Sequence, residues 1–172
     1  MGKIYLITGG DEYAVKNKTR EIITSQCGKD PEGNPCLEII HGDSPDLDLS
    51  RDIGQMLESL ATPAFLGSAK TIWLKNLDFE KFEIFDDEKK SKSAKTLQEL
   101  FEKFLDMLKN GIPDETTLVM SIFSMDRRST IFKACQKTAE ISFFEKVDIR
   151  SKDWNDKLRT VIHDSCRKNN VK

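Results

Sequence analysis

The feature that most constrains the fold is a regular alternation of short apolar runs with longer segments of helical periodicity. Five apolar runs are typical of buried strands and occupy residues 3–8, 37–41, 71–75, 117–123 and 140–145. Between them, apolar residues recur every three or four positions, which predicts helices. Strands that are apolar throughout and alternate with helices indicate a parallel sheet covered on both faces. We therefore expect a three-layer α/β domain with a five-stranded, mostly parallel sheet.

The expected helices begin at residues that suit a helix N-terminus. Asp11 is expected to cap a helix that runs to about Gln26, and Asp126 is expected to cap a later one. The inward residues of that later helix are expected to be Ile131, Phe132, Cys135 and Ala139. Two further helices are expected over residues 49–60 and 97–108.

A last helix is expected from about Ser151, and its apolar stripe is expected to be buried against the preceding domain. That stripe consists of Trp154, Leu158, Val161, Ile162 and Cys166.

Charge and composition exclude several classes of protein. The net charge of −2 gives no reason to expect non-specific nucleic-acid binding by the whole chain. No apolar run approaches the roughly 18 residues of a membrane span, so we expect a cytoplasmic protein that does not interact with a membrane. The four cysteines form no CxxC pair, so neither a disulfide framework nor a zinc site is expected.

The first strand is followed by GGDEYAVK, where a nucleotide-binding protein of this class would carry its phosphate loop. The second glycine of a phosphate loop is missing, and Asp11 and Glu12 place negative charge where phosphates would sit. The third strand ends in Leu74, Lys75 and Asn76 rather than in magnesium-binding carboxylates. No dinucleotide fingerprint and no nucleophile elbow is present. We therefore expect no catalytic, cofactor-binding or metal-binding residues and no cofactor.

Several stretches carry a resemblance through their order and spacing. YLITGGDEYAVKNKTREI is followed by ATPAFLGSAKTIWLKN, then by DETTLVMSIFSMDRRSTIFKACQKTAEISFF, and last by the Trp-containing KDWNDKLRTVIHDSCRKNNVK. Together they resemble the N-terminal part of the delta subunit of the bacterial DNA polymerase III clamp loader. The chain departs from that family where Ser68-Ala69-Lys70 leaves one lysine in place of a frequent basic pair.

The resemblance implies an AAA+/P-loop-like domain without a functional nucleotide site. It implies a non-catalytic subunit of the DNA polymerase III holoenzyme that binds and opens the beta sliding clamp for loading onto primed DNA. The clamp-binding residues that it implies are Ala64, Phe65 and Leu66. Expected partners are the beta clamp, the gamma/tau and delta prime subunits, and DNA through the assembled complex. The alternatives are a divergent AAA+ nucleotidase and a scaffold domain of another complex.

The same resemblance divides the chain in two. Residues 1–146 are expected to form the AAA+-like, clamp-binding domain, and residues 147–172 a linker and the first helix of a truncated lid domain. Four cations of the later helix could touch DNA or a partner subunit, or could form an ordinary solvated face. They are Arg127, Arg128, Lys133 and Lys137.

Overall fold

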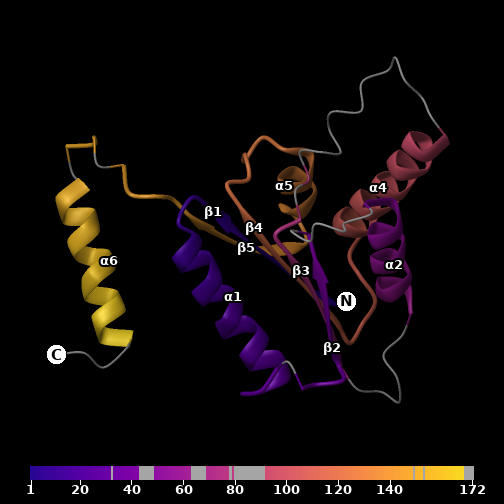
Figure 1. Ribbon diagram of the computed structural model, residues 1–172, viewed down its shortest axis with the longest axis horizontal. Coiled ribbons are helices and arrows are strands. Elements are labelled where there is room, and N and C mark those ends of the chain that lie inside the picture. The colour runs from indigo at the N-terminus through magenta and orange to yellow at the C-terminus, as the bar shows by residue number, and fades with distance from the viewer. Residues whose placement is uncertain are drawn as a thin grey trace.

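A five-stranded parallel sheet organises the computed structural model of the chain (Figure 1). The structure describes residues 1–31, 33–42, 49–62, 69–77, 79, 92–148, 150–152 and 154–168. The sheet has the order β2-β3-β4-β1-β5, and each neighbouring pair of strands is parallel. The predicted α/β class and the predicted sheet are thus confirmed.

Each predicted strand is present, within a residue or two of its expected bounds. The strands are β1 (Lys3–Gly9), β2 (Leu37–His41), β3 (Lys70–Lys75), β4 (Thr116–Phe123) and β5 (Ala139–Phe144). The helices are α1 (Glu12–Cys27), α2 (Leu49–Ala61), α4 (Lys92–Asn110), α5 (Thr130–Cys135) and α6 (Trp154–Lys168).

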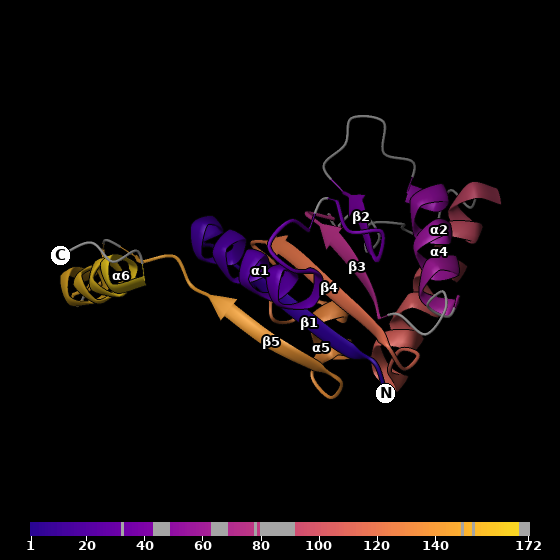
Figure 2. The ribbon, with the colours of Figure 1, turned by 90° about the horizontal axis from the view of Figure 1, so that it is seen from below.

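Helices cover the two faces of the sheet unequally (Figures 1 and 2). α2, α4 and α5 lie on one face, and α1 lies on the other. Successive side chains of β4 alternate between the two faces and so contribute to both cores. Leu118 and Met120 point toward the three helices, whereas Val119 points toward α1. On the α1 face, Trp73 and Phe123 are only partly buried. One face of the sheet is therefore well covered, and the other is partly open.

The larger core explains why α4 is the clearest helix in the sequence. Its stripe of apolar residues is buried at Leu97, Phe101, Phe104, Leu105 and Leu108. Phe79, which follows β3, stacks on Phe104 with ring centroids 5.8 Å apart. Full burial of a side chain of this size contributes about 1.5–3 kcal/mol, so this stripe fixes α4 against α2 and the sheet.

Two predictions about α5 are wrong. Ser129 caps this helix, since its hydroxyl accepts a hydrogen bond from the Phe132 N–H over 3.3 Å. Asp126 forms a turn instead, because its carboxylate accepts the Arg128 N–H over 2.7 Å. Ala139 belongs to β5 rather than to the helix. Ile131, Phe132 and Cys135 are buried as predicted.

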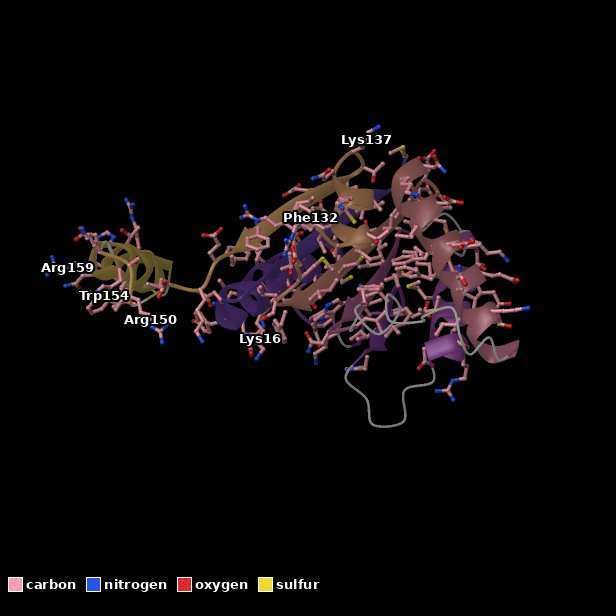
Figure 3. All side chains as sticks on the ribbon, turned by 90° about the horizontal axis from the view of Figure 1, so that it is seen from above. Lys16, Phe132, Lys137, Arg150, Trp154 and Arg159 are labelled. Carbon is pink, nitrogen blue, oxygen red and sulfur yellow. The ribbon has the colours of Figure 1, made fainter. Side chains whose placement is uncertain are left out.

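The prediction that α6 is buried is also wrong. The helix begins at Trp154 rather than near Ser151, and it stands apart from the sheet at the end of an extended segment (Figures 1 and 3). Trp154, Leu158 and Ile162 lie four residues apart on one face, and they are 36%, 37% and 53% exposed. A periodic stripe defines the apolar side of a helix, but nothing in the stripe states what covers it.

Candidate functional site

The predicted clamp-binding residues connect α2 to β3. Ala64, Phe65 and Leu66 lie outside the residues that the structure describes, so their positions stay predictions. The chain is described up to Thr62: α2 continues to Ala61, and Thr62 closes its last turn by donating its N–H to the Glu58 carbonyl over 3.0 Å. The chain is described again at Ala69, and β3 begins at Lys70.

Polar side chains join the two ends of this connection. The Lys70 ammonium donates to the Ser59 carbonyl over 3.0 Å, and its Nζ lies 3.7 Å from Oε2 of Glu38. The Ser59 hydroxyl donates to the same Glu38 carboxylate. We call these three residues the Glu38–Ser59–Lys70 clasp. Because the side chains of Lys70 and Glu38 are only 21% and 32% exposed, water screens the ion pair less than it would on an open surface.

The clasp fixes the base of the predicted binding segment to the sheet. Glu38 belongs to β2, Ser59 to α2 and Lys70 to β3, so one polar cluster ties three elements together. The backbone N–H of Lys70 also donates to the Glu115 carbonyl just before β4, over 2.9 Å. A segment with both ends held in this way loses less conformational freedom when it binds a partner.

Sequence reasoning missed the clasp, although the sequence carries a signal for it. Glu38 and Lys70 are in phase with Ile40, Ile72 and Leu74, which point toward α2. A charged residue that shares the inward face of a strand needs a partner, so opposite charges on two neighbouring inward faces predict an ion pair. The third member is a serine on another helix, and no local pattern could have identified it.

The turn after β1 lies at the opposite end of the sheet, where the carboxyl ends of the strands meet. The Ala14 N–H donates to the Asp11 carboxylate over 3.0 Å, so Asp11 caps α1 as predicted. The backbone N–H of Asp11 donates to the Phe144 carbonyl over 3.2 Å. Gly9 has a φ of 135°, and a Cβ at this position would collide with the same carbonyl oxygen. Groups of the protein itself thus accept the hydrogen bonds of two backbone N–H donors of this turn, those of Asp11 and Ala14.

The two arginines beside this turn pair with carboxylates. Arg127 lies 3.0 Å from Glu145, and its guanidinium stacks over the Phe143 ring with a distance of 4.0 Å to the ring centroid. Arg128 lies 2.9 Å from Asp126. The hydrogen bonds from Arg128 hold the pKa of the Asp126 carboxyl below its usual range. Lys133 and Lys137, the other two predicted cations, are exposed.

Two features are absent from the described part of the chain. Its side chains contain no group of three or more histidine, cysteine, aspartate or glutamate residues placed to hold a metal ion. No helix in the same part of the chain is long and apolar enough to cross a membrane.

Comparison with known proteins gives two positive findings. The model of the family described as "DNA polymerase III, delta subunit" matches residues 5–144. Among solved structures, the chain is similar to the Bacillus subtilis DNA clamp loader delta protein, with a TM-score of 0.54 and 14% sequence identity. That match covers 86% of this chain and 40% of the Bacillus chain, so the present chain spans less than half the length of that protein. No curated protein matches the sequence significantly.

Proposed function

The chain belongs to the DNA polymerase III delta subunit family, and from this membership we propose that it is a non-catalytic clamp-loader subunit that binds the beta sliding clamp and opens it. The family match, which spans residues 5–144, is the observation that carries the proposal. In the proposed complex, the gamma/tau and delta prime subunits are its neighbours, and DNA is contacted through the assembly.

We assign clamp contact to Ala64, Phe65 and Leu66. What supports this assignment is the place of the segment in the chain, between α2 and β3, whose facing ends are tied together by the Glu38–Ser59–Lys70 clasp. Two large apolar side chains that enter a pocket on a partner each contribute about 1.5–3 kcal/mol, and a few such anchors dominate an interface. Pro63 comes shortly before the pair, and its ring fixes its own φ, which reduces the freedom that the chain loses on binding.

The proposal that the subunit is non-catalytic is supported by the turn after β1. The Asp11 carboxylate accepts the N–H group with which a helix N-terminus would hold a phosphate, and the Phe144 carbonyl lies against Gly9. We further propose that residues 1–146 are the clamp-binding unit and that residues 147–172 begin a second unit. The exposed apolar face of α6 is consistent with this boundary.

The test is a binding measurement with the beta clamp of the same organism. The double variant Phe65→Ala, Leu66→Ala is expected to weaken binding by at least a hundredfold, while the thermal midpoint stays close to that of the unaltered chain. Tyr13→Ala is the matched control, because Tyr13 is an aromatic side chain that is 61% exposed on α1. Unchanged clamp affinity in the double variant would contradict the assigned residues, and hydrolysis of ATP by the chain would contradict the non-catalytic role.

A further inference from the structure

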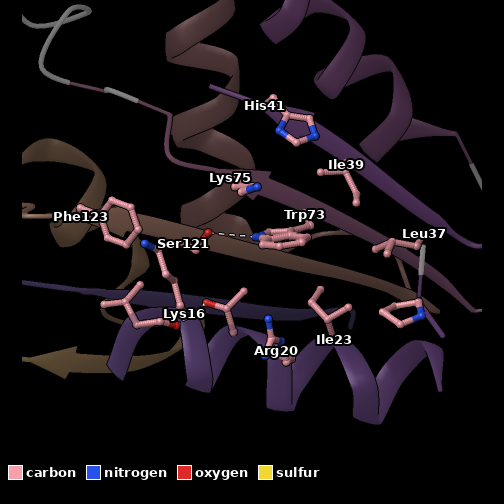
Figure 4. A pocket seen from close by; sticks show the side chains of 13 residues that line it. Lys16, Arg20, Ile23, Leu37, Ile39, His41, Trp73, Lys75, Ser121 and Phe123 are labelled. Atoms are coloured by element: carbon pink, nitrogen blue, oxygen red, sulfur yellow. Dashed lines mark hydrogen bonds between the residues drawn. The ribbon is translucent and has the colours of Figure 1, made fainter. Parts of the chain in front are cut away.

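A pocket lies on the partly open face of the sheet, where α1 leaves the strands β2 and β3 uncovered (Figure 4). Its volume is about 640 Å³, which is within the range typical of sites for small organic ligands. The turn after β1 does not contribute to it. Thirteen residues from α1, β2, β3, β4 and the loop after α1 line the pocket.

The floor of the pocket is apolar and includes two aromatic rings. Leu37 and Ile39 come from β2, Trp73 comes from β3 and Phe123 comes from β4. All four are only partly buried, because α1 is the one helix that packs on this face of the described sheet. The rings of Trp73 and Phe123 are thus partly accessible from the pocket, with the ammonium groups of Lys75 and Lys16 over them.

The rim of the pocket is cationic. Lys16 and Arg20 extend from α1 on one side, and Lys75 extends from β3 on the other. His41 also lies at the edge, and none of the described residues that line the pocket is acidic. This local excess of positive charge contrasts with the net charge of −2 of the whole chain. Lys16 also pairs with a carboxylate, since Glu12 is 3.5 Å away in a solvent-exposed pair, which contributes little.

Ser121, from β4, also lines the pocket. Lys16 enters the pocket from α1 and Lys75 enters it from β3, and Figure 4 shows Lys16 ending beside Phe123 and Lys75 lying beside Trp73. The Lys16 ammonium lies 5.3 Å from the Phe123 ring centroid, and the Lys75 ammonium lies 5.6 Å from that of Trp73. The indole N–H of Trp73 donates to the Ser121 hydroxyl over 2.9 Å. That hydroxyl is buried and donates no hydrogen bond to any described residue, so its own hydrogen remains available.

This combination selects the chemical class of the ligand. A simple inorganic anion would satisfy the cations but would leave the apolar floor in contact with water. An uncharged apolar ligand would cover the floor but would desolvate the ammonium groups without a partner. A ligand with a phosphate and a flat ring satisfies both parts, since phosphates attract lysines and hydroxyl donors and bases stack on aromatic side chains.

We propose that this pocket is a nucleotide-binding site, in which Lys16, Lys75 and the Ser121 hydroxyl hold a phosphate and the rings of Trp73 and Phe123 stack against the base. The nucleotide is either free or an unpaired member of a single strand, because the two present the same phosphate and base. The site is separate from the turn after β1 and does not depend on binding to a clamp.

The fluorescence of Trp73 tests the proposal directly. The chain has two tryptophans, so in the variant Trp154→Phe all indole emission comes from Trp73. AMP and a short single strand of deoxyadenylate are each titrated into this variant, and both are expected to quench the emission saturably. Equal affinity for the two, per nucleotide, identifies a free nucleotide as the ligand, whereas much tighter binding of the strand identifies unpaired nucleic acid.

Charge-removing variants in the Trp154→Phe background locate the binding. Lys16→Met and Lys75→Met keep the aliphatic stem and remove the ammonium group, and each is expected to weaken binding roughly tenfold or more. Lys133→Met is the matched control, since Lys133 is an exposed cation on α5 on the opposite face of the sheet, and it is expected to leave affinity unchanged.

Several outcomes would overturn the proposal. One is the absence of quenching by either ligand up to about 1 mM. Another is an affinity for AMP in both the Lys16→Met and the Lys75→Met variant that equals that of the Trp154→Phe parent. A third is binding of inorganic phosphate that is as tight as that of AMP. Saturable quenching by an acidic apolar peptide, with none by nucleotides, would show instead that the surface takes a protein. Circular dichroism of each variant establishes that it is folded.

Discussion

Cys135 illustrates how burial alone changes the chemistry of a residue. Its side chain is fully buried in the larger core, and this burial raises the pKa of the thiol to about 12. The unfolded thiol titrates near pH 9. Between these two values the unfolded chain loses a proton that the folded chain retains, so this thiol contributes stability that is complete below pH 9 and is lost as the pH rises toward 12.

The pH dependence of unfolding checks this contribution. From pH 8 to pH 10, the free energy of unfolding of the unaltered chain is expected to fall by about 1 kcal/mol more than that of Cys135→Ala, because only the former exposes the Cys135 thiol on unfolding. Chemical denaturation at both pH values measures the difference. Parallel pH profiles for the two proteins would contradict the raised pKa.

Single residues also decide where α5 begins. Both Asp126 and Ser129 are good N-cap types, and the apolar residues that follow suit either start. The structure places Ser129 at the cap because Arg128 engages the Asp126 carboxylate through its backbone N–H and its guanidinium. The choice therefore depends on a side-chain interaction that apolar periodicity does not reveal.

Substitution of each candidate cap shows whether Ser129 or Asp126 stabilises the N-terminus of α5. Ser129→Ala is expected to lower the free energy of unfolding by about 1 kcal/mol, the usual effect of removing an N-cap. Asp126→Ala is expected to have a smaller effect, since its partner Arg128 is exposed and water screens their pair. Denaturant titrations of both variants measure the free energy of unfolding. A larger loss for Asp126→Ala than for Ser129→Ala would indicate that Asp126 is the cap.

At the scale of elements, most of the architecture was predictable because strands and helices leave different periods in the sequence. β1 and β4 are buried on both faces, so each needs a continuous apolar run. α4 is buried along one face, so it needs an apolar residue at every third or fourth position. The charges of Glu38 and Lys70 on two inward strand faces carried a signal for their pair, but the third member of the clasp was not predictable, since Ser59 comes from another element and meets them only after the sheet has formed. The candidate clamp-binding residues came from the family resemblance rather than from local chemistry.

The position of α6 is a property of the whole molecule. Its apolar stripe looked like a buried face, yet Trp154, Leu158 and Ile162 are exposed, and the helix stands apart from the sheet (Figure 3). If these three side chains were buried against the domain, their removal would cost several kcal/mol, at about 1.5–3 kcal/mol each.

Removal of α6 therefore tests the arrangement. A chain that ends at Arg150 is expected to melt within about 3 °C of the 172-residue chain, because the sheet and both cores are retained. Differential scanning calorimetry compares the two. A drop of about 10 °C or more would mean that α6 packs on the domain in solution.

Gly9 links regions that are distant in the sequence. The Phe144 carbonyl lies where a Cβ would project from Gly9, and Phe144 is the last residue of the edge strand β5. Any larger residue at this position would have to displace the end of that strand, and the segment leading to α6 starts immediately afterwards. A single methyl group added at Gly9 would consequently displace the end of β5 and, with it, the start of the segment that leads to α6.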